Sequence, residues 1–223
     1  LYTGAPTFYD VIMMNPPFGG KEGKGAQTNF AYKTGATQVL FLQNVIQHLN
    51  PNNGVCGIVL DEGVLFRTNE TAFVQTKRKL LDDCDLWCII SMPGGVFSAA
   101  GAGVKTNLLF FVKGKSTEKI WYYDLSDIKV GKKKPFTIEK FDEFFHLLPT
   151  RGDSERSWTI DIVARREEAR RQAEPLREQA KKPTAEAASL MEKVKELKKT
   201  KPDDKTEIEE ISKRAAALTK EAN

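Results

Sequence analysis

Short apolar runs alternate with amphipathic segments over the first two thirds of the chain, and this alternation limits the fold more than any other feature. Five runs of strand length occupy residues 8–14, 54–60, 86–93, 106–114 and 119–125. In Gln38–Leu49 and Thr71–Leu81, apolar residues recur every three or four positions, which predicts helices with one buried face. Strands and helices in this order predict an α/β domain with a mainly parallel sheet, in which the first strand is covered on both faces.

The composition changes abruptly after about Trp158, where Ala, Glu, Lys, Arg and Gln come to dominate. We therefore expect two parts, residues 1–158 and residues 159–223. The second part carries heptad-like apolar stripes at Ala169, Ala173, Leu176 and Ala180, at Ala187, Leu190, Val194 and Leu197, and at Ile208, Ile211, Ala215 and Leu218. Prolines predict helix breaks near Pro183 and Pro202 and a kink at Pro175. Because stripes this thin leave a lone helix marginal, the tail is expected to need helical partners.

The tetrapeptide Asn15-Pro16-Pro17-Phe18 ends the first apolar run and is the strongest candidate for a catalytic site. Each proline keeps the residue before it extended. This presents the Asn15 amide oxygen and the Pro16 carbonyl as two fixed acceptors, with a flat ring beside them. The exocyclic amine of adenine is a poor nucleophile, and acceptors for both of its hydrogens help it attack an electrophilic methyl group. A rigid turn with Phe18 in the core is the structural alternative.

The basic, glycine-rich loop that follows, "GGKEGKG", is a candidate for contact with nucleic-acid phosphates through Lys21 and Lys24. Base stacking on Phe18 contributes about 1–3 kcal/mol, comparable to the cost of taking a base out of a duplex. The formal net charge of +4 is too small to identify a nucleic-acid partner by itself.

Cysteine usage and hydropathy exclude several classes of protein. Three cysteines in apolar surroundings suit buried thiols rather than disulfides, and the two histidines lie apart from them, so we expect no metal site. No apolar stretch reaches membrane-spanning length and no signal peptide is evident, which favours a cytoplasmic protein without a membrane partner.

Three segments together resemble the modification (M) subunits of type I restriction-modification systems, which are N6-adenine DNA methyltransferases. They are "DVIMMNPPFGG", "MPGGVFSAAGAGVKTNLLFFVKG" and "EKIWYYDLSDIKVGKKKPFTIEKFDEF". The resemblance covers roughly Tyr9 to Trp158. It implies that residues 1–158 are the back half of a class I, Rossmann-like methyltransferase sheet, followed by a charged α-helical tail over residues 159–223.

The same resemblance implies a cofactor, partners and residue roles. Asn15, Pro16, Pro17 and Phe18 fall on the family's catalytic tetrapeptide, and Asn15 also borders the site of the methyl donor, S-adenosylmethionine. The family's donor-binding glycine loop precedes that tetrapeptide, so we expect the main donor site upstream of Leu1. The implied partners are DNA, a specificity subunit that reads the DNA sequence, and a restriction subunit.

Two alternatives stay open. The same tetrapeptide occurs in methyltransferases that act on RNA bases or on glutamine amides of proteins. The second alternative is that the chain is a non-catalytic helical assembly module, whose sheet only supports the tail.

Overall fold

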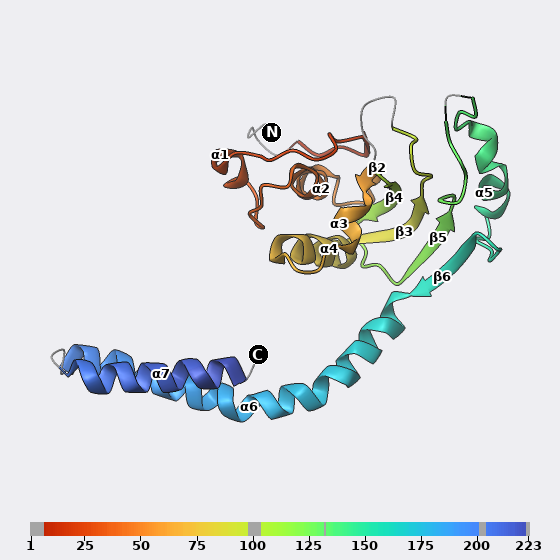
Figure 1. The fold of residues 1–223 in the computed structure, drawn as a ribbon. Helices are drawn as coiled ribbons and strands as arrows, with labels where there is room; N and C mark the ends of the chain where they lie inside the picture. Colours follow the sequence, from red (N-terminus) through yellow and green to blue (C-terminus); the bar gives the residue numbers. More distant parts are fainter. Residues whose placement is uncertain (1–6, 98–103, 132, 201–203, 222–223) are drawn as a thin grey trace. The chain divides into compact units, whose positions relative to one another are not determined.

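The chain folds into a six-stranded sheet with flanking helices, followed by two long helices (Figure 1). The computed structural model describes residues 7–97, 104–131, 133–200 and 204–221. The strands are β1 (Val11–Met14), β2 (Val55–Asp61), β3 (Cys84–Ser91), β4 (Thr106–Lys113), β5 (Lys119–Asp124) and β6 (Ser157–Asp161). The helices are α1 (Lys24–Gln27), α2 (Thr37–His48), α3 (Glu62–Phe66), α4 (Thr71–Asp83), η2 (Ile138–Phe141), α5 (Asp142–Leu147), α6 (Ile162–Thr200) and α7 (Lys205–Glu221).

The sheet has the order β1-β2-β4-β3-β5-β6 and mixed strand directions. β1 pairs with β2 and β3 with β5 in parallel, whereas β4 runs antiparallel to both β2 and β3, and β6 is antiparallel to β5. The prediction of a mainly parallel sheet is therefore wrong. An apolar run predicts a strand without its direction, which depends on whether a long crossover or a short link joins it to its neighbours.

One face of the sheet is covered by α2 and α4, and the largest hydrophobic cluster lies between them and the strands. The apolar stripe predicted for α2 is fully buried, at Val39, Leu42, Val45 and Ile46. These side chains pack against Phe73 and Leu80 of α4 and against Cys56, Ile58, Leu60, Leu109 and Phe111 of the sheet. Burying each such aliphatic side chain contributes about 1.5–3 kcal/mol, so this layer holds the strands in place.

The described residues cover the opposite face only toward β3 and β5. There Trp121, Tyr123 and Phe144 form an aromatic cluster with Cys88, Ile90 and Met92, beneath η2 and α5. The Tyr123 hydroxyl donates to Glu143 Oε2 at 3.0 Å. Burial and this neighbouring carboxylate raise the pKa of Tyr123 to about 12, so the hydroxyl stays a donor.

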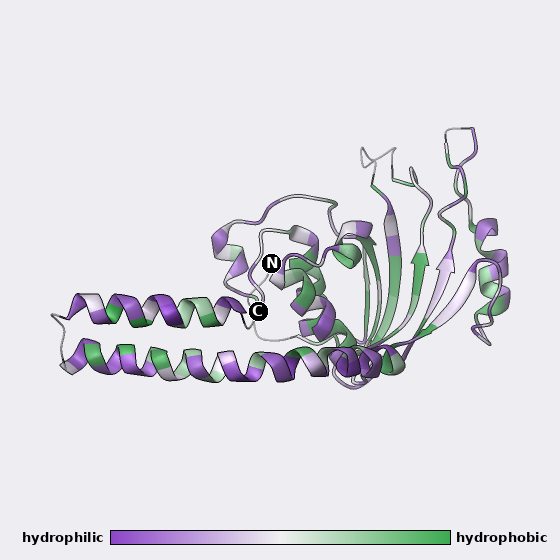
Figure 2. Cartoon of the chain, turned by 60° about the horizontal axis from the view of Figure 1, so that its bottom comes forward, coloured by the Kyte–Doolittle hydropathy of each residue, from purple (hydrophilic) through white to green (hydrophobic). Residues whose placement is uncertain are grey.

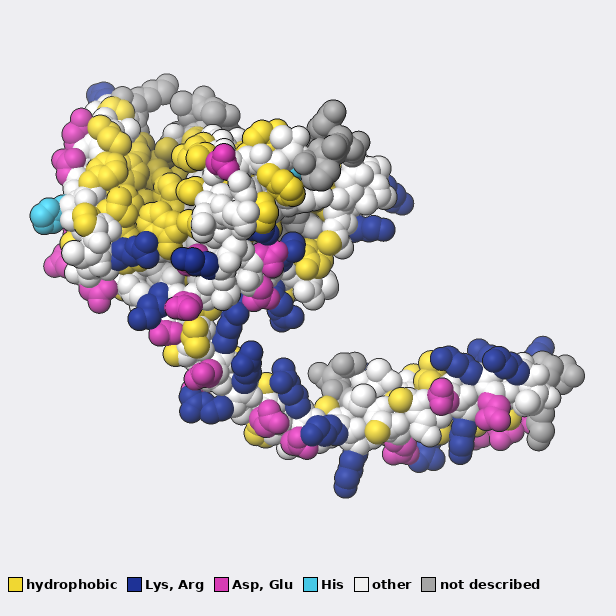
Figure 3. Space-filling view, turned by 180° about the vertical axis from the view of Figure 1, so that it is seen from behind, with side chains coloured by type: hydrophobic (Ala, Val, Ile, Leu, Met, Phe, Trp, Pro, Cys, Tyr) yellow, Lys and Arg dark blue, Asp and Glu magenta, His cyan; other side chains and the backbone are white. Residues whose placement is uncertain are grey.

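Toward β1 and β2 the same face carries exposed apolar side chains. Val11 is 63% and Met13 72% exposed, while Ile12 and Met14 pack against the covered side. Gly57 lies directly beside Met13, and a Cβ at position 57 would come within 2.9 Å of the Met13 sulfur. Figure 3 shows hydrophobic side chains gathered in a hollow of this face. The prediction that the first strand is covered on both faces is therefore wrong for the described residues, since η2 and α5 cover this face only near β3 and β5.

The chain divides into two compact units between Ile162 and Val163. In the second unit, α7 lies beside the second half of α6, with Ala187, Val194 and Ala215 buried between them (Figures 1 and 2). An ion pair joins Arg214 to Glu186 at 2.8 Å. Figure 2 shows several strands coloured as largely hydrophobic and others as intermediate, whereas α6 and α7 are mostly hydrophilic with interrupted apolar positions.

Helix α6 continues through Pro175 and Pro183, so the predicted break at Pro183 is wrong. Proline removes one backbone hydrogen bond from a helix interior. Most of the side chains of α6 are exposed, so water can hydrate the carbonyl groups that lose their partner. Pro202, the other predicted break, lies outside the described residues.

Candidate active site

The Asn-Pro-Pro-Phe loop, residues 15–18, follows directly on β1 at one edge of the sheet. β1, β2, β3 and β5 all point the same way, because β4 is antiparallel to both β2 and β3. The loops that follow these four strands therefore lie on the same side of the sheet, at the carboxyl ends of the strands. In open α/β sheets, ligands bind at the carboxyl ends of the strands.

Asn15 presents its side chain outward, whereas Pro16 is buried beneath it. Neither the Asn15 carboxamide nor the Pro16 carbonyl forms a hydrogen bond with the residues that the structure describes. Neither oxygen is therefore used as an acceptor within this part of the chain. The buried ring of Pro16 holds the backbone between them, since proline fixes its own φ and restricts the residue before it.

Phe18 is half-buried and packs against a second aromatic residue, Phe97, with the ring centroids 5.0 Å apart and the planes at 55°. Phe97 follows β3, in the stretch "MPGGVF". Its place beside Phe18 was not predicted from the sequence. One sequence signal could have indicated Phe97: it is an aromatic residue shortly after β3, whose carboxyl end lies on the same side of the sheet as that of β1. The two rings form an apolar corner at the end of the loop that begins with Asn15 and Pro16.

A cavity of about 360 Å³ opens beside Asn15 on the uncovered face of the sheet. Its other lining residues are Met13, Met14, Gly57, Ile58, Val59, Leu108 and Phe110. Asn15 is its only polar side chain among the described residues. S-adenosylmethionine carries a charged amino-acid end and ribose hydroxyls, which need hydrogen-bonding and charged partners. The described lining alone does not fit this cofactor.

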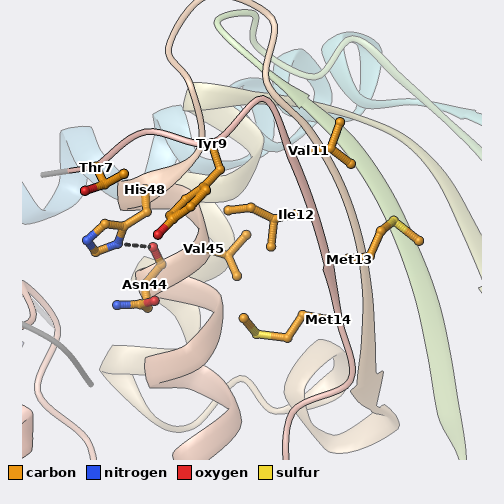
Figure 4. A pocket seen from close by; sticks show the side chains of 9 residues that line it. All are labelled: Thr7, Tyr9, Val11, Ile12, Met13, Met14, Asn44, Val45 and His48. Carbon is orange, nitrogen blue, oxygen red and sulfur yellow. Dashed lines mark hydrogen bonds between the residues drawn. The ribbon is translucent and has the colours of Figure 1, made fainter.

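A second cavity, of about 390 Å³, follows the outer edge of β1 (Figure 4). It is lined by Thr7, Tyr9, Val11, Ile12, Met13, Met14, Asn44, Val45 and His48. His48 Nδ1 is hydrogen-bonded to the Asn44 carbonyl at 2.9 Å, which fixes the ring along α2. The cavity runs beside the edge of β1 that pairs with no strand of the described residues, a typical place for another strand to add.

The predicted phosphate-binding lysines, Lys21 and Lys24, are both exposed in the segment after the loop. Lys21 pairs with Ala36 in an isolated antiparallel bridge, and Lys24 begins the short helix α1. The glycine-rich segment is therefore held at defined points. Contact of Lys21 and Lys24 with DNA stays a prediction.

The three cysteines lie buried in the sheet and take no part in this site. Burial raises the thiol pKa to about 12 for Cys56 and Cys88 and to about 11 for Cys84. A thiol protonated at neutral pH is a weak nucleophile and a poor metal ligand. Within the described ranges, no three His, Cys, Asp or Glu side chains are grouped so that they could hold a metal ion. The described helices also include none with the length and hydrophobicity to cross a membrane.

The sheet order and the position of the loop define the back half of a class I S-adenosylmethionine-dependent methyltransferase fold. A Listeria monocytogenes protein described as such a methyltransferase has the same fold at 12% identity, with a TM-score of 0.51 over 65% of this chain and 43% of that one. At this identity the likeness shows the fold alone.

The chain belongs to the N-6 DNA methylase family, whose family model matches residues 4–187. It is 36% identical over 176 residues to the type I restriction enzyme EcoEI methylase subunit of Escherichia coli, covering 70% of this chain and 34% of that protein. A chain in a solved structure of a type I restriction-modification system is 37% identical, with a TM-score of 0.66 over 72% of this chain and 36% of that one. The predicted resemblance is confirmed, and the chain spans about a third of the length of these relatives.

Proposed function

We propose that this chain carries the target-base site of a site-specific N6-adenine DNA methyltransferase of the type I restriction-modification class. The observation that carries the proposal is the Asn-Pro-Pro-Phe loop itself, at the carboxyl end of β1, with Asn15 exposed and the Phe18 ring beside Phe97. Family membership supports adenine in DNA as the substrate.

In the proposed mechanism an adenine leaves the duplex and stacks on Phe18, while Phe97 closes the corner behind it. The Asn15 side-chain oxygen and the Pro16 carbonyl accept the two hydrogens of its exocyclic amine. These bonds strengthen as the nitrogen becomes tetrahedral, so they stabilise the transition state more than the ground state. S-adenosylmethionine is the proposed source of the methyl group.

The donor pocket is proposed to be built mainly by residues that this chain does not contain. The cavity beside Asn15 has an apolar lining, and no described residue there offers the charged partners that the donor needs. The isolated chain is expected to show no measurable heat of binding with S-adenosylmethionine in calorimetry. Tight binding would place the donor site within these residues.

The α6–α7 unit is proposed to bind a DNA-specificity subunit, and through it the complex would engage a restriction subunit. Its buried positions are small, and Leu176 and Met191 stay 66% and 50% exposed, which leaves apolar surface for a partner's helices. Removing residues 163–223 should leave the sheet unit folded and abolish co-elution with the specificity subunit. A truncated chain that still co-elutes at full stoichiometry would contradict this role.

The proposed function is tested by methylation with DNA, RNA and protein acceptors, using an active assembly that contains this chain. Mass spectrometry should find N6-methyladenine in DNA only. Methylated RNA bases or methylated glutamine would favour the other Asn-Pro-Pro-Phe enzymes. If no acceptor is methylated by any assembly that contains the chain, the non-catalytic helical module becomes the better account.

A further inference from the structure

The segment after the Asn-Pro-Pro-Phe loop is tied back to the start of α2, and this tie concerns Glu22 and Thr37. The Glu22 amide donates to the Gly35 carbonyl at 2.8 Å, and the Glu22 carbonyl accepts from Gln27 Nε2 at 2.9 Å. The Thr37 hydroxyl donates to Glu22 Oε1 at 3.1 Å. Glu22 therefore meets the rest of the fold through its amide, its carbonyl and its side chain.

Two glycines, Gly19 and Gly20, separate Phe18 from the backbone bridge that Lys21 forms with Ala36. Gly19 and Gly20 have φ values of +73° and +91°, a region that glycine enters freely and other residues rarely adopt. Glycine allows the turn without making it rigid. The loop is fixed at its start because Met14 pairs with Ile58 of β2, so its geometry depends on a second fixed point after the glycines.

Thr37 contributes to that point, together with the backbone bonds of Lys21 and Glu22 to residues 35 and 36. It is 6% exposed, and its hydroxyl meets Gly20 so closely that a Cβ on the glycine would lie 3.0 Å from Thr37 Oγ1. The same hydroxyl holds the Glu22 carboxylate. Thr37 thus leaves room for no side chain at position 20 and binds the Glu22 side chain.

The Glu22 side chain also lies near the N-terminus of α2, where a negative charge is favourable. Helix α2 has no side-chain cap and no acidic residue in its first turn. A carboxylate held near a helix N-terminus interacts favourably with the positive end of the helix dipole. Hydrogen bonds to a charged acceptor are also stronger than neutral ones. The Glu22 carboxylate therefore has two reasons to stay beside Thr37.

We propose that Glu22 and Thr37 are positioning residues of the target-base site, whose hydrogen bond fixes the far end of the segment that carries Asn15 and Phe18. This inference rests on the proposed function for its catalytic consequence. Its structural part, the anchoring of residues 19–22, stands without it. Since small displacements of reacting groups cost large factors in rate, loss of the bond should lower kcat more than it raises KM for DNA.

Thr37→Val removes the hydroxyl and keeps the shape of the side chain, whereas Thr37→Ser keeps the hydroxyl. In the chain itself, hydrogen exchange of the Glu22 amide should become about tenfold faster in Thr37→Val, the usual effect of losing one such bond, and stay near wild type in Thr37→Ser. Thr76→Val is the matched control, because Thr76 is 1% exposed and its hydroxyl has no partner among the described residues. It should leave exchange of Glu22 unchanged.

In an active methyltransferase assembly, Thr37→Val and Glu22→Ala should each lower kcat about tenfold or more, with KM for DNA within about twofold. Glu22→Gln, which retains an acceptor oxygen, should recover much of the rate. If Thr37→Val does not fold, Glu22→Ala carries the test, since Glu22 is only half-buried.

Unchanged exchange in the folded variants would overturn the anchoring. Faster exchange with unchanged kcat would overturn the positioning role. An assembly that methylates no DNA in its wild-type form would instead contradict the proposed function, while the exchange data would still decide whether the pair anchors the loop.

Discussion

The two ends of the sheet differ in how many of their faces are covered. At the β3–β5 end, α4 packs on one face, and the aromatic cluster of Trp121, Tyr123 and Phe144 covers the other. At the β1–β2 end, only the α2 side is covered by described residues, and Val11 and Met13 face outward. The exposed side chains are apolar, which is unusual for a surface that stays in water.

The proposed catalytic loop lies at the incompletely covered end. Asn15 directly follows the edge strand β1, and one cavity opens along the outer edge of β1 and another on its uncovered face. The chain spans about a third of its relatives' length. We infer that further structure completes the β1 side and contributes most of the donor pocket, while the β3–β5 end serves as the rigid support.

The difference between the two ends of the sheet is tested most sharply by removing one large side chain from each end and comparing the losses in stability. Trp121 is 1% exposed, so Trp121→Ala should lower the free energy of unfolding by about 3–5 kcal/mol. Met13 is 72% exposed, so Met13→Ala should change it by less than about 1 kcal/mol. Denaturant titration of both variants measures the difference. Equal losses would show that the β1 face is packed in solution.

Phe18 lies at the incompletely covered end and should affect function more than stability. Phe18→Ala is expected to weaken capture of the extruded adenine by about 1–3 kcal/mol, because stacking on the ring is lost. Phe18→Tyr should keep most of the binding, since stacking needs only an aromatic face. The fluorescence of 2-aminopurine placed at the target position reports base capture. If Phe18→Leu binds as well as Phe18→Tyr, the ring is only a packing residue.

The smallest expected effect is the pH dependence of stability that arises from two buried thiols, Cys56 in β2 and Cys88 in β3. Because burial raises the pKa of Cys56 and Cys88 from 9.0 to about 12, the unfolded chain ionises these thiols first as pH rises. Stability is therefore retained below pH 9 and lost progressively between pH 9 and 12. At pH 9 the loss is about 0.4 kcal/mol per thiol by proton linkage.

Denaturant titrations at pH 7 and pH 9, for wild type, Cys56→Ala and Cys88→Ala, isolate each contribution, since the cavity left by each substitution cancels between the two pH values. Equal contributions would show that the covered face of β2 is as dry as the interior near β5. A missing contribution from Cys56 would show that water reaches the core from the β1 side.

Much of the sheet unit was predictable from periodicity alone. Helices α2 and α4 and strands β2 to β5 lie where the apolar patterns placed them, because each pattern reflects burial against a neighbour within the chain. Strand β1 was predicted as a strand but not as an exposed edge. Its four apolar residues carry the same pattern whether or not the described residues supply the covering layer.

The site was predicted in part for a related reason. The Asn-Pro-Pro-Phe loop is continuous in sequence, so its proposed chemistry can be inferred from four adjacent residues. Phe97 and Thr37 reach the same region from other elements, and only the folded chain shows them beside Phe18 and Gly20. The roles of Asn15, Pro16, Pro17, Phe18, Lys21 and Lys24 remain proposals.

The central claim is that Asn15 accepts a hydrogen of the target amine, and Asn15→Ala tests it most directly. In an active assembly, this change should lower the rate of adenine methylation by about a hundredfold or more, as expected when one fixed hydrogen-bond partner of the transition state is lost. Binding of DNA and of S-adenosylmethionine should stay within about threefold of wild type, because little else is removed. Asn29→Ala, at an exposed asparagine beyond α1, is the matched control and should leave the rate unchanged. Methylation by Asn15→Ala within tenfold of wild type would contradict the account.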